Sequence, residues 1–468
     1  MKLNFQNTFA RLPESFFKKN EPTPVIQPSI IAVNDGLAEE LGIDPDFLRS
    51  DEGLAFLSGN SIPEGAEPLA MAYAGHQFGG FSPKLGDGRA ILMGEIGGKD
   101  IQLKGAGPTS FSRRGDGRSA LGPVLREYLV SEAMHALGIP TTRALAAVMS
   151  GELVLREQPE KGGILTRVAS SHLRIGTAQY FAARDDTESL KALVEYAIQR
   201  HNLQASTAFE LFQDVIRKQA QLVAQWMGHG FIHGVMNTDN MSILGETFDY
   251  GPYGFMEDYL PSYVCNHSDH QGRYAFKNQP YIGLWNCSAL GHALSSLISE
   301  EAQGKILQTY EEIFQSTLAE LFRKKLGLEQ EQSEDATLIQ GLLDIMESEK
   351  LDYTNTFRNL TQALTNKITP ELNSDIAKSW IVSFQERHTK EGLSVDKKVI
   401  SMKQVNPKFI LRNYMAQEAI DAAEESDFSM LETLIIILTK PFEEHKEYQN
   451  FANKSPAWAK DLEISCSS

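Results

Sequence analysis

The sequence lacks three features that mark common classes of protein. It has no run of the roughly 18 to 20 apolar residues that span a bilayer. Its first residues contain neither the apolar core nor the small-residue cleavage site of a secretory signal. It has no excess of basic residues, because 61 Asp and Glu against 44 Lys and Arg give a formal net charge of −17. These absences predict a cytoplasmic protein that binds neither membrane nor nucleic acid, since both attract clustered basic side chains.

Cysteine is also scarce. The three cysteines, Cys265, Cys287 and Cys466, are too few and too scattered for a disulfide framework or a zinc site. A single regulatory pair remains open. The 42% apolar and 22% charged residues are typical of a folded protein, and 468 residues suffice for two or three layers or lobes.

The first half of the chain contains a strand-rich region and one clear helix. The runs RAILMGEI and IQLKG, joined by Gly-Gly, predict a β-hairpin whose second strand ends at Lys104. A basic, glycine-rich loop follows. The segment 123–140 then has apolar residues at helical spacing and a Gly and Pro stop, which predicts an amphipathic helix that carries Glu127.

A second long helix is predicted after a capping box formed by Thr207 and Glu210. It ends at Gly228-His229-Gly230, and the chain is mostly helical beyond residue 284. A strand-rich part followed by a larger helical part predicts an α+β fold, the two-lobed plan of a protein kinase with nucleotide between the lobes. The predicted division is an N-terminal extension packed on the core (1–65), an N-lobe (66–150), a helical C-lobe (151–440) and a C-terminal tail (441–468).

The stretch HGVMNTDNMSILGETFDYG, residues 233 to 251, has the residue types of a metal–nucleotide site. Asn240 precedes Asp249-Tyr250-Gly251 by nine residues. An amide and a carboxylate in this order are the ligands that hold magnesium on nucleotide phosphates in kinases. We therefore expect Asn240 and Asp249 to bind Mg²⁺, with Mn²⁺ as an alternative, and ATP to be the co-substrate.

The other kinase parts occur in the expected order, with one exception. Lys104 corresponds to the kinase strand lysine that binds phosphate, and Glu127 corresponds to the helix glutamate that orients this lysine. Glu127 could instead lie on a solvated face of its helix. His233 corresponds to the catalytic-loop histidine. The kinase proton acceptor falls on Val235, which cannot accept a proton, and Asp239 is the nearest carboxylate. Each motif alone is more typical of a turn or a surface, so only the ordered set indicates a nucleotide site.

At this point the chain resembles a known family. It is similar to the selenoprotein O family, called YdiU in bacteria, as a cysteine-containing bacterial member. The similarity lies in GDGRAILMGE, in QLKGAGPTSFSRRGDGRSALGPVLREYLVSEAMHALGIPTTRALA, in ILTRVASSHLRIGTAQY, in HGVMNTDNMSILGETFDYGPYGFMEDY and in NPKFILRNYMAQEAI. The resemblance implies a kinase-like fold with family-specific extensions and ATP bound in a flipped orientation. It also implies transfer of AMP, rather than phosphate, to Ser, Thr or Tyr hydroxyls of proteins.

The resemblance also implies roles for particular residues. It makes Asp239 the catalytic proton acceptor, and Asn240 and Asp249 the metal ligands. Arg167 and Arg174 become additional phosphate-binding residues, which could stabilise leaving charge on the β and γ phosphates. The full set implied to bind nucleotide is Gly86, Gly88, Arg89, Lys104, Asp116, Gly117, Arg167, Arg174 and Asp249.

Several alternatives remain open on the sequence. Asp239 could accept a proton or only orient the hydroxyl or the metal, since a loose transition state gains little from a base. The protein could also be a conventional kinase, which Val235 disfavours, or a silent nucleotide-binding pseudokinase scaffold, which the retained Lys104, Asn240 and Asp249 disfavour.

The tail DLEISCSS raises a separate possibility. The family resemblance implies redox chemistry near the C-terminus, where many members have selenocysteine, and Cys466 lies three residues from the end. Cys287 lies in an apolar helical pattern that suggests burial. We therefore expect a reversible Cys265–Cys466 disulfide that lowers transfer until it is reduced. The alternative is a flexible tail with an idle thiol.

Overall fold

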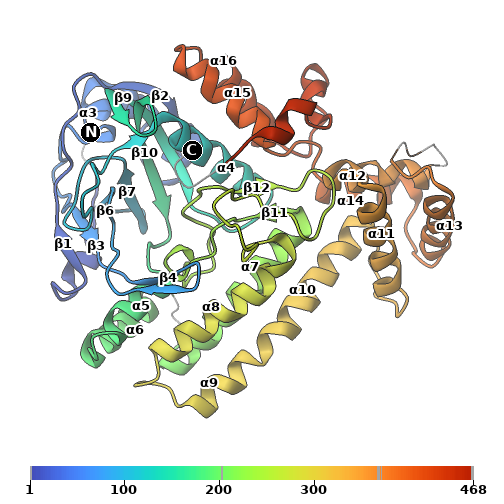
Figure 1. Cartoon of the computed structure of the whole chain (residues 1–468), viewed down its shortest axis with the longest axis horizontal. Helices are drawn as coiled ribbons and strands as arrows, with labels where there is room; N and C mark the ends of the chain where they lie inside the picture. The colour runs from blue at the N-terminus through green and yellow to red at the C-terminus, as the bar shows by residue number, and fades with distance from the viewer. Residues whose placement is uncertain (1–2, 202–203, 366–368, 370, 465–468) are drawn as a thin grey trace.

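The computed structural model describes residues 3–201, 204–365, 369 and 371–464. The fold is α+β: an antiparallel sheet is formed early in the chain, and the later part is almost entirely helical (Figure 1). In the view of Figure 1 the sheet lies at the left, and the helices α10 to α14 extend to the right. Within the described residues, no helix has both the length and the apolar character needed to cross a membrane.

The main sheet has eight strands in the order β1-β3-β6-β7-β10-β9-β2, with β8 paired to β10. Its strands pair with one another in antiparallel fashion. Its strands are β1 (Phe17–Lys19), β2 (Ser29–Val33), β3 (Leu69–Met71), β6 (Ala90–Ile96), β7 (Lys99–Lys104), β8 (Ser119–Ala120), β9 (Arg143–Leu155) and β10 (Pro159–Ala169).

The predicted hairpin and both predicted helices are confirmed. The hairpin is β6 and β7, and Gly97 and Gly98 make its turn with φ of 59° and 77°. The first helix is α4 (Leu121–Ala136), and the second is α7 (Ala208–His229). At the start of α7 the Thr207 hydroxyl accepts the N–H of Glu210, but the Glu210 carboxylate accepts from Ser206, so the capping box forms only in part.

The amphipathic description of α4 is incomplete. Arg126, Glu127 and Glu132 are all buried, although their charges suggested a solvated side. The reason is that α4 contacts β9 and β10 of the sheet and also the late helices α15 (Asn413–Glu424) and α16 (Ser429–Leu438). A helix covered on both sides has no face left for water, so its charged residues are held by buried partners.

Two predicted boundaries do not match breaks in the structure. The division at residue 150 falls inside β9, and β10 continues the same sheet to Ala169. The segment 1–65, predicted as an extension packed on the core, contributes β1 and β2 to the two ends of the main strand order. Its short helices are α1 (Asp35–Glu40), α2 (Pro45–Arg49) and α3 (Asp51–Leu57), and they pack on a second apolar cluster that includes Ile91 and Ile101.

The helical part surrounds the stretch 233–253. This stretch lies between the short paired strands β11 (Phe231–Ile232) and β12 (Gly254–Phe255), directly after α7. The remaining helices of the described chain are α5 (Ile175–Ala182), α6 (Thr187–His201), α8 (Gln279–Ala293), α9 (Glu300–Leu307), α10 (Thr309–Lys325), α11 (Asp335–Glu349), α12 (Tyr353–Leu364), α13 (Asp375–Thr389) and α14 (Val395–Val405). The largest apolar cluster joins α4, α5, α7 and α8, so the sheet and the stretch 233–253 share one core.

Candidate active site

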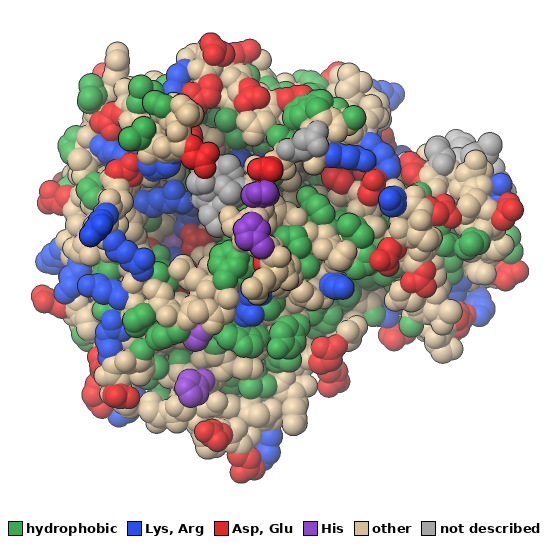
Figure 2. Space-filling model, viewed as in Figure 1, with side chains coloured by type: hydrophobic (Ala, Val, Ile, Leu, Met, Phe, Trp, Pro, Cys, Tyr) green, Lys and Arg blue, Asp and Glu red, His purple; other side chains and the backbone are tan. Residues whose placement is uncertain are grey.

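A cavity of about 860 Å³ lies where the sheet meets the stretch 233–253. Its volume falls within the range of small-ligand pockets, roughly 300 to 1,000 Å³. Figure 2 shows the hollow, with Lys and Arg side chains (blue) gathered along its left side. The predicted residues that line it are Gly86, Gly88, Arg89, Lys104, Asp116, Gly117, Arg167, Asp239, Asn240 and Asp249.

The floor of the cavity is a chain of buried ion pairs. Lys104 on β7 pairs with Glu127 on α4, and Arg167 on β10 donates through Nε to the same carboxylate at 2.7 Å. Burial lowers the pKa of Lys104 to about 8. Burial also raises the pKa of Glu127, but Arg167 and Lys104 outweigh it and the net pKa is lowered. Glu127 therefore stays ionised and holds two cations in the pocket.

Asp249 receives two arginines. Arg167 donates to its Oδ1 and Arg174 to its Oδ2, each at 2.8 Å. Burial raises the pKa of Asp249, yet the two guanidinium groups reverse this and hold the pKa well below its ordinary value. Arg174 also donates to the Asp239 carbonyl at 2.8 Å and lies 4.1 Å over the Tyr73 ring. Both arginines are thus positioned around one anion, although Arg174 is not among the residues that line the cavity.

Asp249 also has an unusual backbone. Its φ of 58° lies in the left-handed region, which residues other than glycine seldom occupy. Such conformations collect at functional sites because the surrounding contacts must hold them. Here His233 contributes, since its Nε2 contacts the carbonyl of the preceding residue Phe248 at 3.1 Å. His233, which corresponds to the kinase catalytic-loop histidine, therefore helps to hold the backbone that leads into Asp249.

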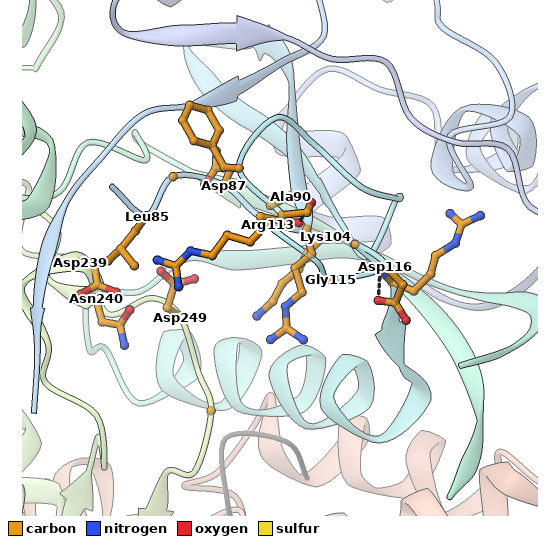
Figure 3. Close-up of a pocket in the computed structure, with 18 of the residues that line it drawn as sticks. Leu85, Asp87, Ala90, Lys104, Arg113, Gly115, Asp116, Asp239, Asn240 and Asp249 are labelled. Atoms are coloured by element: carbon orange, nitrogen blue, oxygen red, sulfur yellow. Dashed lines mark hydrogen bonds between the residues drawn. The ribbon is translucent and has the colours of Figure 1, made fainter. Parts of the chain in front are cut away.

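The residues that could hold magnesium lie together at one end of the cavity. Figure 3 places Asp239 and Asn240 side by side with Asp249 close to them, while Asp116 lies at the opposite end. The Asn240 amide nitrogen donates to the Val235 carbonyl at 3.0 Å, which leaves its oxygen as the available ligand. The amide of Asn240 and the carboxylate of Asp249 are ligands that suit a hard cation sharing its coordination with phosphate. The described residues contain no cluster of three or more His, Cys, Asp or Glu side chains arranged for a metal.

Asp239 has a different environment from Asp249. It is 5% exposed, and burial raises the pKa of its carboxyl to about 6. Its Oδ2 accepts a hydrogen bond from Gln77 Nε2 at 3.0 Å, and its Oδ1 has no hydrogen-bond partner within the described chain. Val235, which replaces the kinase aspartate, lines the cavity with an apolar surface. Asp239 is therefore a cavity-lining carboxylate with one unpaired oxygen and a raised pKa.

In both GDGR loops a glycine has a positive φ and lacks room for a Cβ atom. Gly86 has φ of 78°, and a Cβ there would lie 2.3 Å from the Phe111 ring. Gly117 has φ of 67°, and a Cβ there would lie 2.1 Å from the backbone of Gly107. Asp116 lies on the outer side, where a hydrogen bond from Arg156 is the largest cause of its lowered pKa. The two loops thus form tight walls at the cavity mouth.

The comparisons with known proteins show the family of this chain. The family model described as "Protein adenylyltransferase SelO" matches residues 1–439 of the chain. The chain belongs to the SelO family. Relatives in this family include the protein nucleotidyltransferase YdiU of Rhizobium etli, 50% identical over 95% of this chain and 93% of that protein. The protein of the same name from Methylorubrum populi is 49% identical over 96% of each chain, and that of Rhizobium meliloti is 48% identical over the same shares.

Several residues that line the cavity were not predicted from the sequence. Gln77 and Asp87 line the cavity, and Asp87 accepts the Met71 N–H at 3.0 Å. Arg113 and Arg114 also line it, and Figure 3 shows Arg113 extending across the cavity. The basic loop SFSRRGDGR was a signal for the arginines, and GDGR was one for Asp87. No pattern in the sequence indicated Gln77, which lies far from residues 233–251 along the chain.

The structure describes only Cys265 of the two cysteines in the predicted disulfide. Cys265 is buried, its thiol donates to the Pro252 carbonyl at 2.9 Å, and burial raises its pKa to about 12. Cys466 lies outside the described residues. Two residues earlier in the chain, the Ile464 carbonyl accepts the His267 N–H at 2.9 Å. The last described part of the tail therefore contacts the segment that follows Cys265. Cys287 is fully buried, as its apolar pattern suggested.

Proposed function

We propose that this protein transfers AMP from ATP to Ser, Thr or Tyr hydroxyls of other proteins and releases pyrophosphate. The acceptor oxygen forms a bond to the α-phosphorus, the α–β phosphoanhydride bond breaks, and the hydroxyl proton leaves to Asp239 or to water. The observation that carries the proposal is the meeting of Lys104, Arg167 and Arg174 around the two carboxylates of Glu127 and Asp249. The membership of the SelO family supports it.

The fold that we propose is the two-lobed plan of a protein kinase, with family-specific extensions at both ends. The lobe boundary is moved to the end of β10, so that the N-lobe includes the whole sheet and α4. The helical lobe then begins near α5 and contains residues 233–251. A strand lysine, a helix glutamate and an Asp-Tyr-Gly segment around one cavity support this assignment.

Magnesium is the metal that we propose, held by Asn240 and Asp249, with Mn²⁺ as the alternative. When bound, it would neutralise phosphate charge that the protein cations do not reach. Arg167 and Arg174 now pair with Asp249. With a metal ion held by that carboxylate, both arginines would be available to the triphosphate, and their present pairing already orients them for such an anion.

We propose that ATP binds in the flipped orientation that the family resemblance implies, and the position of the cations supports this. Arg167 and Arg174 are each 2% exposed, and both pair with Asp249, which lines the cavity. A nucleotide whose β and γ phosphates reach these cations would present its α-phosphate toward Asp239. Charge that develops on the leaving pyrophosphate then falls on Lys104 and both arginines. Gly86, Gly88, Arg89, Asp116 and Gly117 would line the remainder of the nucleotide.

Two roles are open to Asp239 in the proposed reaction. As a proton acceptor it would take the hydroxyl proton, and as an orienting group it would only align the hydroxyl with the α-phosphorus. The raised pKa of about 6 keeps the carboxyl mostly ionised at neutral pH and leaves it more basic than an exposed aspartate. A location in the cytoplasm and the Cys265–Cys466 pair stay predictions.

The decisive experiment uses ATP labelled separately at the α and γ phosphates, with Mg²⁺ and a protein acceptor mixture. AMP transfer predicts label on protein from the α position alone. Label from γ alone would show a conventional kinase. Label from neither, with ATP still bound, would show a silent scaffold. Asp249→Ala, run in parallel, identifies the label that depends on this site.

A further inference from the structure

The hairpin formed by β4 (Gly75–Gln77) and β5 (Gly80–Ser82) is fastened to the loop that carries Asp239. The His76 N–H donates to the Thr238 hydroxyl at 2.7 Å, and the Phe78 N–H donates to the Asn237 side chain at 3.1 Å. At Gly75, a Cβ would lie 2.2 Å from Asp239 Oδ1. Together with the hydrogen bond from Gln77 to Oδ2, these contacts make the hairpin one wall of the acceptor side (Figure 1).

The hairpin also exposes two large aromatic side chains, one directly after the cavity-lining Gln77 in the chain and one on the facing strand. Phe78 and Phe81 are each 43% exposed. Phe78 has φ of 49°, a conformation that a bulky residue rarely adopts. Its backbone is held there by the Asn237 side chain and by the Tyr274 hydroxyl, which accepts its N–H at 3.1 Å. The Phe78 ring is therefore partly exposed and packs edge-on against Tyr274. It directly follows Gln77, the residue that contacts Asp239.

A cation lies beside the tip of this hairpin. The Arg273 guanidinium carbon is 4.9 Å from the Trp285 ring centroid and 3.6 Å from the Cβ position of Gly79. Within the described residues this guanidinium pairs with no carboxylate and its buried Nε has no hydrogen-bond partner, while its side-chain contacts are with Tyr274 and Trp285. A half-buried guanidinium without a counter-ion favours an acidic group supplied from outside.

We propose that the hairpin 75–82, with Arg273, is the docking surface for the acceptor polypeptide. This rests on the proposed function. The acceptor is an extended, hydroxyl-bearing segment with an apolar side chain against Phe78 and Phe81. It also has an Asp or Glu within about three residues of the hydroxyl, a reach of roughly 10 Å along an extended chain. The carboxylate pairs with Arg273 while the hydroxyl reaches Asp239.

The test measures transfer of α-labelled AMP to ten-residue peptides with one central Ser. One set has Leu and Asp within three residues of the Ser, and matched sets have Gly for Leu or Lys for Asp. We expect the Leu and Asp set to be modified about 10-fold faster at low peptide concentration, through a lower KM. Equal labelling of all the sets would overturn the docking surface.

Two variants connect the preference to these residues. Phe78→Ala with Phe81→Ala should raise KM for the Leu peptide several-fold and leave ATP affinity unchanged, whereas Phe209→Ala, an exposed phenylalanine on α7, should have no effect. Arg273→Glu should reverse the preference from Asp to Lys peptides, and Arg217→Glu, also on α7, should not. A preference retained by both hairpin-side variants would contradict the inference.

Failure of this inference can be told apart from failure of the proposed function. If the protein places α label on itself or on proteins of a lysate but shows no peptide preference, only the docking surface is wrong. If no acceptor of any kind takes the α label, the proposed function is wrong as well.

Discussion

Two aspartates that lie ten residues apart in the chain have opposite environments in the same cavity. Asp249 receives a guanidinium on each oxygen, and its pKa lies well below the ordinary value. Asp239 has a single amide donor, from Gln77, and burial raises its pKa to about 6. The same side chain therefore occurs in one cavity as an anion held by two arginines and as a more basic carboxylate. We propose that the first serves the phosphate side of the site and the second the acceptor side.

The largest effect is expected at the permanent anion. Asp249→Ala should reduce AMP transfer by about 1,000-fold or more and abolish Mg²⁺-dependent ATP binding, because no neutral side chain replaces a carboxylate ligand. Calorimetric ATP titrations with and without Mg²⁺, together with α-label transfer, measure both. Asp214→Ala, which removes a carboxylate from the surface of α7, is the control. Normal transfer by the Asp249 variant would refute the kinase-like site.

Asp239→Ala should separate the two aspartates. Transfer should fall about 100-fold while ATP affinity stays close to that of the parent, since an acceptor-side group acts on the barrier more than on nucleotide binding. Steady-state kinetics and an ATP titration of the same preparation test this. A large loss of ATP affinity with unchanged turnover would make Asp239 a metal ligand, and the contrast with Asp249 would disappear.

The hairpin offers a way to disturb Asp239 without altering it. Gly75→Ala should lower transfer about 10- to 100-fold, because its Cβ would occupy space 2.2 Å from Asp239 Oδ1. Gly80→Ala on the facing strand is the matched control, since its Cβ would meet only the Gln77 carbonyl at 3.5 Å. Circular dichroism checks that both fold. Equal activity of the two variants would show that the contact at Gly75 does not position Asp239.

These two regions also show what the sequence could and could not predict. The Asp249 side was predictable because its parts are ordered motifs, so Lys104, Glu127 and the Asp-Tyr-Gly segment could be found from spacing. The second partner of Glu127 was missed, because the contact with Arg167 joins β10 to α4 across the sheet. Gln77 could not be found at all, since it reaches Asp239 only through the tertiary fold. Long-range contacts of single polar residues leave no periodic signal.

The domain boundaries were harder to predict from the sequence than the helices and strands. The helices and the hairpin were found because their periodicity and caps are local. The break at residue 150 was misplaced because β9 and β10 form one long hairpin that spans it. The burial of charges on α4 was also missed, since a helix covered on both sides cannot be distinguished by pattern from one with a solvated face.

The smallest effect is expected at the tail. If Cys265 and Cys466 form a disulfide, oxidation should lower transfer a few-fold, and reductant should restore it. Because the Cys265 thiol is buried against Pro252, forming the bond requires that segment to open. Peptide mapping of oxidised protein and assays with and without reductant measure this, with Cys466→Ala as the insensitive control. The absence of a 265–466 crosslink would remove the switch.

The most direct test of the central claim is the intact mass of a modified acceptor protein after incubation with ATP and Mg²⁺. The account predicts an increase equal to one adenosine monophosphate, which is absent when Asp249→Ala replaces the parent protein. An increase equal to a phosphate group would contradict the proposed orientation of ATP, in which Arg167 and Arg174 hold the leaving pyrophosphate and the α-phosphate faces Asp239.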